Sequence, residues 1–305
     1  MEILKVENLS KSFGTHKVID GLSFSVDEHT IYGFLGQNGS GKTTTMKMIL
    51  GLLKADSGTI TVCGEKVTYG ETKTNKYIGF LPDVPEFYGY MKPKEYLKLC
   101  GEITGLSKVA IKQKSEELLN LVGLTDVNRR IGGFSRGMKQ RLGIAQALLN
   151  EPRILICDEP TSALDPVGRK DILDILLSIK DKTTVIFSTH ILTDVERVCE
   201  NIGMINDGKL AISGNINELK EVNRHDIIYI EFENENDRKL ACTCLEKLEG
   251  IKEITSEKNS LTIKVNDVKK TGKSIIHKID GEQIYILKYE ILEPTLESIF
   301  MEVVQ

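Results

Sequence analysis

The chain has 305 residues, 40% of them hydrophobic and 28% charged, which allows one large domain with a smaller one or two of similar size. A formal net charge of −4 gives no reason to expect nucleic acid as a partner. No run approaches the roughly 18 apolar residues of a membrane span, and the start lacks the regions of a signal peptide. The six cysteines are scattered, which indicates a reduced, cytosolic setting. We therefore expect a soluble chain that reaches a membrane only through a partner.

The N-terminal segment has the alternating pattern of β-strands. Residues 2–8 predict a strand, residues 9–14 a turn, and residues 18–19 and 22–26 further strands, so an antiparallel sheet is expected. The apolar run at residues 31–35 predicts a buried strand.

A glycine-rich stretch follows this strand directly and precedes a helix-like stretch. It matches G-x-x-x-x-G-K-[ST], a phosphate-binding loop in which backbone N–H groups surround the anion and the next helix adds its positive end. Lys42 would reach the β- and γ-phosphates, and the Thr43 hydroxyl would hold Mg²⁺. A glycine turn without a ligand is the alternative, but the flanking pattern favours a nucleotide site. The residues expected to bind the nucleotide are Gly36, Gln37, Asn38, Gly39, Ser40, Gly41, Lys42, Thr43 and Thr44.

The middle of the chain alternates between strands and helices. Strands are predicted at residues 57–62, 77–82, 153–158 and 184–188, and a helix at 171–179. Residues 93–125 carry apolar positions at helical spacing, which predicts a helical insertion, within about residues 90–150, into an α/β core with a parallel sheet.

Polarity rises near residue 220, where we place a domain boundary between residues 1–220 and 221–305. Strands at 227–232, near 254, at 261–265 and at 284–287 alternate with helices at 237–247 and up to 277, and a helix closes the chain at 295–304. This order predicts a small α+β domain of the ferredoxin-like, split β-α-β-β-α-β type, either regulatory or dimerising.

Two carboxylates, Asp158 and Glu159, end the apolar strand at residues 153–158. Asp158 is expected beside Mg²⁺, and Glu159 is expected to orient the attacking water and take up its proton. Two acids at a strand end are also common at the solvated start of a loop, and the phosphate-binding loop favours catalysis.

Residues 134–149 resemble the signature motif and helix of ATP-binding cassette (ABC) proteins, usually Leu-Ser-Gly-Gly-Gln, here with Phe134, Ser135 and Gly137. Residues 160–165, which end at Asp165, are similar to the D-loop of that family, and Ser188-Thr189-His190 to its switch histidine. Phe13 occupies the place of the aromatic that stacks on adenine. The resemblance covers about residues 1–215.

The resemblance implies a P-loop NTPase fold and an ATPase that uses ATP and Mg²⁺. Two copies would pack head to tail, so that Ser135 and Gly137 of one contact the γ-phosphate held by the other. His190 would contact the γ-phosphate and support catalysis with Glu159, and Asp165 would connect the two sites.

Three positions depart from the family pattern. Arg136 and Met138 stand in the signature where glycine and glutamine are commoner, and Asp83 stands where the Q-loop glutamine is expected, with Glu86 as a second candidate. A carboxylate can bind Mg²⁺ or its water but cannot donate a hydrogen bond as an amide does. Asp83 is therefore a candidate metal ligand, or else a turn residue after Pro82.

The Q-loop, the signature and the C-terminal domain resemble the branch of ABC-2-type exporters that includes antibiotic-efflux systems. We expect a homodimer that drives export through separate polytopic permease subunits at the cytoplasmic face of the membrane. The aromatic stretch at residues 84–91 would contact the permease, or simply pack the insertion. The alternatives are a soluble cassette ATPase acting on ribosomes or nucleic acid, and a different P-loop enzyme such as a kinase or GTPase.

Overall fold

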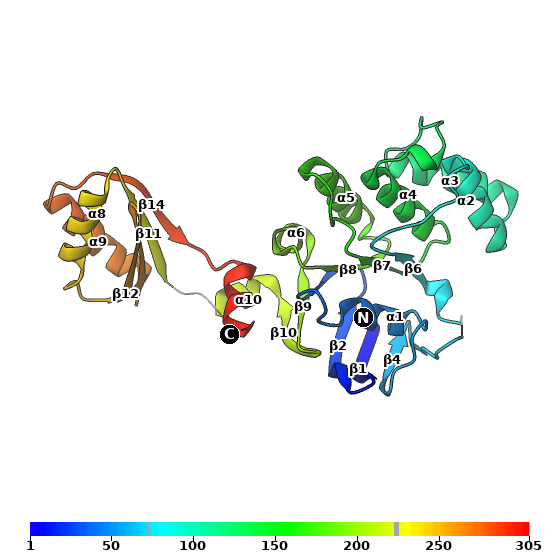
Figure 1. Ribbon diagram of the computed structural model, residues 1–305, viewed down its shortest axis with the longest axis horizontal. Coiled ribbons are helices and arrows are strands. Elements are labelled where there is room, and N and C mark those ends of the chain that lie inside the picture. Colours follow the sequence, from blue (N-terminus) through cyan, green and yellow to red (C-terminus); the bar gives the residue numbers. More distant parts are fainter. Residues whose placement is uncertain (72, 223–225, 305) are drawn as a thin grey trace. The chain divides into compact units, whose positions relative to one another are not determined.

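The computed structural model describes residues 1–71, 73–222 and 226–304. The chain divides into two compact units, Met1–Ile216 and Asn217–Gln305, which are described separately. Figure 1 shows the elements of both along the chain.

An antiparallel sheet of four strands opens the first unit. Its strands are β1 (Glu2–Phe13), β2 (His16–Asp27), β4 (Ser57–Val62) and β5 (Glu65–Lys66), in the order β2-β1-β4-β5. The turn predicted at residues 9–14 is wrong, because β1 continues to Phe13 through register shifts. Leu9 is fully buried in this strand, and the polar residues after it pair with β2, so their polarity concealed the strand.

A mixed sheet of six strands forms the centre of the first unit. It is made of β3 (Ile31–Leu35), β6 (Ile78–Leu81), β7 (Ile154–Asp158), β8 (Thr184–Thr189), β9 (Asn201–Asn206) and β10 (Lys209–Asn215). The order is β10-β9-β3-β8-β7-β6, and every pair is parallel except β10 with β9. The predicted parallel sheet is confirmed, whereas the β9–β10 hairpin was not anticipated.

Helices cover both sides of this sheet (Figure 1). Helix α1 (Lys42–Ile49) shares one apolar core with the antiparallel sheet and with β3, β7 and β8. The helical insertion consists of α2 (Pro93–Ile103), α3 (Lys108–Leu121) and α4 (Arg136–Leu148), which pack on one another, and α4 also packs on β6. Helices α5 (Pro166–Ile179) and α6 (Leu192–Val198) contact each other, and α6 contacts β3. Two short 3₁₀ turns occupy Asn75–Tyr77 and Ile131–Gly133.

The second unit contains a four-stranded antiparallel sheet in the order β12-β13-β11-β14. Along the chain it runs β11 (Ile227–Phe232), α8 (Glu235–Leu245), β12 (Ile251–Glu257), β13 (Ser260–Val265), α9 (Val268–Gly281) and β14 (Ile286–Leu292), which is the β-α-β-β-α-β order. Alternate residues of β11 and β13 form a separate apolar core with α8 and α9. Helix α7 (Ile216–Val222) starts at the boundary between the units, before this sheet, and α10 (Leu296–Val304) comes after the sheet, at the end of the second unit.

Candidate functional site

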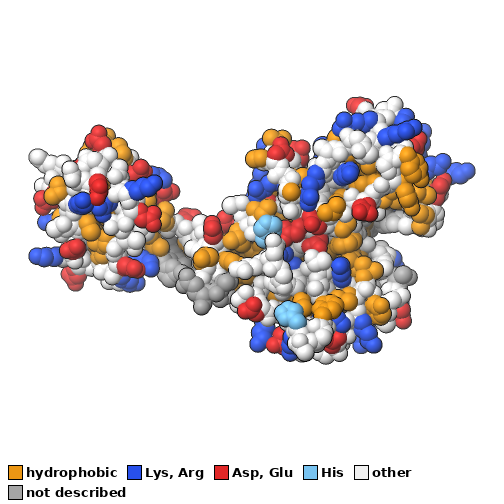
Figure 2. Space-filling view, viewed as in Figure 1, with side chains coloured by type: hydrophobic (Ala, Val, Ile, Leu, Met, Phe, Trp, Pro, Cys, Tyr) orange, Lys and Arg blue, Asp and Glu red, His pale blue; other side chains and the backbone are white. Residues whose placement is uncertain are grey.

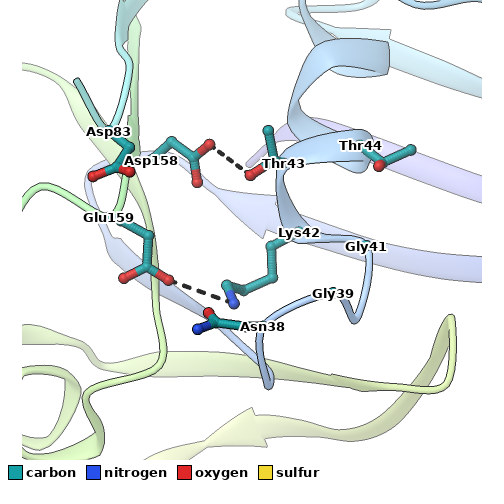
Figure 3. A pocket seen from close by; sticks show the side chains of 9 residues that line it. All are labelled: Asn38, Gly39, Gly41, Lys42, Thr43, Thr44, Asp83, Asp158 and Glu159. Atoms are coloured by element: carbon teal, nitrogen blue, oxygen red, sulfur yellow. Dashed lines mark hydrogen bonds and ion pairs between the residues drawn. The ribbon is translucent and has the colours of Figure 1, made fainter. Parts of the chain in front are cut away.

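The candidate site lies where neighbouring parallel strands of the central sheet end. Strand β3 leads into residues 36–44, β7 ends at Asp158, β8 is followed by His190, and β6 is followed by Asp83. Because the carboxyl ends of parallel strands share one edge, the sheet brings together side chains that are far apart in the sequence (Figure 3).

The loop after β3 has the backbone of a tight anion cradle. Gly39 and Gly41 have φ values of +86° and +106°, which side chains with a Cβ rarely adopt. A Cβ on Gly36 would lie 2.6 Å from the carbonyl oxygen of Ile205. Only glycine therefore lets the backbone of the loop pass this close to β9. Lys42 is 6% exposed, and its Nζ donates to the carbonyl oxygens of Gly36 at 2.8 Å and Gln37 at 3.2 Å.

The carboxylate of Asp158 is held by two hydroxyl groups. Thr43 Oγ1 donates to Oδ2 at 2.8 Å, and Ser188 Oγ donates to Oδ1 at 2.6 Å, while Asp158 is only 4% exposed. Both of its oxygens therefore have a fixed position beside the start of α1. Ser188 was not among the predicted site residues, and the only signal for it was its place before Thr189 and His190 at the end of a buried strand.

The carboxylate of Glu159 lies between the side chains of His190 and Lys42. Its Oε2 is 2.9 Å from Nδ1 of His190, and its Oε1 is 3.5 Å from Nζ of Lys42, toward which it points in Figure 3. The backbone of Glu159 has a φ of 49°, a left-handed conformation that is rare for a residue with a side chain and is typical of functional sites. The Glu159 amide donates to Ser188 O at 3.0 Å and so holds this turn.

These side chains line a pocket of about 320 Å³. Its lining consists of Asn38, Gly39, Gly41, Lys42, Thr43, Thr44, Asp83, Asp158 and Glu159. A second pocket of about 290 Å³ shares Asn38 and Gly39 with it and is also lined by Gln37 and Ser40. The remaining lining residues of the second pocket, which the sequence analysis did not single out, are His16, Lys17, Val18, Asn206, Asp207 and Gly208.

Two buried polar atoms at the site lack a hydrogen-bond partner. They are Ser40 Oγ and Glu159 Oε1. A buried polar atom without a partner is costly, so these atoms call for a bound group that supplies one. The glycine cradle, Lys42 and the Ser40 hydroxyl, which can donate, fit a polyphosphate, whereas Glu159 Oε1 is an acceptor and calls for a donor such as water.

Six predicted site residues lie outside the lining of both pockets: Gly36 and His190, described above, and Ser135, Gly137, Asp165 and Phe13. Ser135 caps α4 by accepting the amide of Met138 at 3.3 Å, and Gly137 lies in the first turn of the same helix. Asp165 caps α5 by accepting the amide of Gly168 at 3.1 Å. Phe13 ends β1 and is 51% exposed, with Lys11 Nζ 5.4 Å from its ring centroid.

Asp83 lines the pocket and also has a second partner. Its Oδ1 accepts Arg136 Nη2 at 2.9 Å, and its carbonyl oxygen accepts Nε2 of Gln140 at 2.6 Å. Two of the three positions that depart from the family pattern, Asp83 and Arg136, therefore contact each other.

Two findings bear on metals and membranes. Within the described ranges, no group of three or more His, Cys, Asp and Glu side chains is arranged to hold a metal ion. In the same residues, every helix is too short or too polar to cross a bilayer.

Comparison with known proteins identifies the family to which the chain is related. Residues 19–162 match the family model described as ABC transporter, and residues 214–304 match that of the C-terminal domain of DrrA1-3-like ATP-binding proteins. The chain is 37% identical to the bacitracin transport ATP-binding protein BcrA of Bacillus licheniformis, over 99% of this chain and 97% of that protein. It is 32% identical to the linearmycin resistance ATP-binding protein LnrL of Bacillus subtilis, over 98% and 97%.

A solved ATP-binding subunit of an ABC transporter has a TM-score of 0.65 and 30% identity, and the match covers 72% of this chain and 92% of that one. The similarity to BcrA and LnrL extends over nearly the whole chain, including the second unit. The chain therefore belongs to the ATP-binding subunits of ABC transporters, the ATPases whose hydrolysis of ATP is coupled to transport.

Proposed function

We propose that this chain powers export through a separate membrane permease, with the pocket at the ends of β3, β7 and β8 as its ATP site. The observation that carries the proposal is the convergence of Lys42, the Thr43–Asp158 pair and Glu159, which His190 contacts, on one pocket. Backbone amides of the glycine loop, the positive end of α1 and the Lys42 ammonium would hold the phosphates.

Charge balance at this pocket favours a divalent cation. Asp83, Asp158 and Glu159 all line it, with Lys42 as the one lining cation, so a bare triphosphate would face net repulsion. We propose that Thr43 and Asp158 hold Mg²⁺, with Asp83 as the further candidate from the sequence. The metal would neutralise phosphate charge, and the remaining ligands would come from phosphate and water, as is usual for Mg²⁺.

Glu159 is the proposed general base. Its carboxylate would accept the proton of the attacking water, and His190 would hold the carboxylate through Nδ1 and Oε2, which are 2.9 Å apart. We propose that His190 also contacts the γ-phosphate, because it is 44% exposed and can face a bound nucleotide.

A second copy of the chain would complete the site. Ser135 and Gly137 lie at the start of α4, whose N-terminus is a natural anion site, yet they do not line the pocket of their own chain. We propose that they contact the γ-phosphate of the partner copy and that Asp165 lies at the junction between the two. Phe13, at the end of β1, is proposed to stack on adenine.

The names of the bacitracin and linearmycin relatives support export of an antibiotic or similar compound by an ABC-2-type system. The permease would be polytopic, and this chain would bind it from the cytoplasmic face. Tyr88 and Tyr90 are 55% and 65% exposed beside the helical insertion and suit such a contact. On the face seen in Figure 2, basic and acidic side chains are interspersed, which does not favour a nucleic-acid partner. For residues 221–305 we propose a regulatory or dimerising role.

The test has two parts. In the first, the chain is isolated from native membranes in mild detergent, and a stoichiometric polytopic protein is expected to accompany it. Isolation with ribosomes or nucleic acid instead would support the soluble cassette ATPase.

In the second part, Glu159→Gln is expected to bind ATP with the affinity of the unaltered chain and dimerise, while its hydrolysis rate falls at least about a hundredfold. Glu246→Gln in the second unit is the control for the same chemical change. Normal turnover by Glu159→Gln would remove Glu159 from the proposed role.

A further inference from the structure

The contact between Asp83 and Arg136 joins two motifs that are separate in the sequence. Asp83 follows β6, and Arg136 is the first residue of α4, inside the signature motif. Arg136 Nη2 donates to Asp83 Oδ1 at 2.9 Å. Each residue by itself departs from the family pattern, but the structure makes the two a complementary pair.

A second bond ties the same loop to the same helix. The side chain of Gln140, one turn beyond Arg136, is fully buried, and its Nε2 donates to the carbonyl oxygen of Asp83 at 2.6 Å. Helix α4 also packs on β6. The loop after β6 therefore has a side-chain and a main-chain connection to the start of the signature helix.

Asp83 belongs to the walls of two cavities. One is the proposed nucleotide pocket, where it faces Asp158 and Glu159 (Figure 3). The other is an adjoining groove of about 460 Å³ that is lined by Asp83, Val84, Pro85, Glu86, Phe87, Arg136 and Lys139. Arg136 thus holds a residue of the pocket wall from outside the pocket.

The ion pair between Arg136 and Asp83 fixes the position of the two side chains but contributes little to stability. The side chains of Arg136 and Asp83 are 39% and 48% exposed, and pairs this exposed add little to the free energy of folding. The guanidinium does offset one of the three carboxylates that the phosphates would meet. It also occupies one of the two carboxylate oxygens of Asp83, Oδ1.

We infer that Asp83 and Arg136 are a positioning pair, which aligns the wall of the nucleotide pocket with the signature helix. In this role Asp83 binds Arg136 and is not a ligand of Mg²⁺. The inference rests on the proposed nucleotide site, adds Arg136 to it and assigns a function to its contact with Asp83.

A double-mutant cycle on ATP hydrolysis tests the pair. Asp83→Asn and Arg136→Gln are each expected to lower kcat about tenfold with little change in KM, and the double variant is expected to be no slower than either single one. The Mg²⁺ concentration for half-maximal rate should stay within twofold in all three. Arg136→Lys retains a charged donor and is expected to recover most of the rate.

Two controls separate the pair from general charge effects. Lys139→Gln removes a positive charge from the same groove and the same helix and is expected to change kcat less than twofold. Asp174→Asn and Arg197→Gln each break an exposed Asp–Arg pair that has the same 2.9 Å distance but does not line the pocket. Each is also expected to change kcat less than twofold. Melting temperatures of all variants show whether they are folded.

Additive losses in the double variant would overturn the inference. A rise of fivefold or more in the Mg²⁺ requirement for Asp83→Asn, with none for Arg136→Gln, would also overturn it and make Asp83 a metal ligand. Lys42→Ala reports on the underlying site separately. If it binds ATP as the unaltered chain does, the proposed nucleotide site fails, and the inference fails with it.

Discussion

Arg169 Nη2 donates to Asp194 Oδ1 at 2.6 Å and so ties α5 to α6. Helix α5 begins directly after Asp165, and α6 begins two residues after His190. Asp194 is 4% exposed, and its Oδ2 is buried without a hydrogen-bond partner. The pair therefore holds the start of α5, next to Asp165, against α6, next to His190.

Replacing Arg169 should destabilise the fold. Arg169→Ala leaves the Asp194 carboxylate buried and unpaired, and we expect a loss of about 3 kcal/mol in the free energy of unfolding, measured with urea. Arg197→Ala is the matched control, because Arg197 joins the same two helices through Asp174 but both side chains are about half exposed. That control should cost about 1 kcal/mol or less. Equal losses would show that burial of Asp194 is not the cause.

The contact between His190 and Glu159 predicts a kinetic effect without a binding effect. His190→Ala removes the group that orients the Glu159 carboxylate, so kcat should fall about a hundredfold. His190 lines neither pocket, so its proposed contact with the γ-phosphate should matter mainly in the transition state, and KM for ATP should change less than threefold. His277→Ala, an exposed histidine in α9, should leave both constants unchanged. A rise in KM as large as the fall in kcat would mean that His190 binds the ground state.

Gly41 is predicted to tolerate no side chain. Its φ of +106° is strained for alanine, and a Cβ there would lie 3.1 Å from the carbonyl oxygen of Val18 and even closer to the Ile19 side chain. We expect Gly41→Ala to cost about 3 kcal/mol and to abolish ATP binding, measured by calorimetry. Gly14→Ala has a similar backbone constraint, with φ +60°, but open space around its Cβ. It should cost about 1 kcal/mol and leave binding intact.

The cysteines provide a test of the central sheet. Burial, with a smaller contribution from Asp158, raises the pKa of the Cys157 thiol well above its ordinary range, and burial raises that of Cys199 likewise. Because the thiolate is the reactive form, both should resist iodoacetamide between pH 7 and pH 9 and react only after denaturation. Partly exposed Cys242 serves as the internal control in the same mass-spectrometric measurement. Rapid labelling of native Cys157 would contradict a closed sheet at β7.

Much of the site could be predicted from sequence because its parts are local. Residues 36–44 form a cradle through their own glycines, and Asp158 and Glu159 follow a buried strand in an unbroken run. The class of fold also followed, since strands and helices alternate with clear periods. The turn predicted at residues 9–14 failed, because polar residues in a bulged strand hide its period.

What only the tertiary structure decided is which distant groups meet. Ser188 binds Asp158 because β7 and β8 are neighbours with that register, and the residues of the β9–β10 turn line the second pocket because β9 lies beside β3. Asp83 and Arg136 meet because α4 packs on β6. The sequence by itself determined the glycine loop at residues 36–44 and the acids at the end of β7, since these depend on local backbone geometry. Sheet order and helix packing supplied the contacts between them, since such contacts depend on the whole chain.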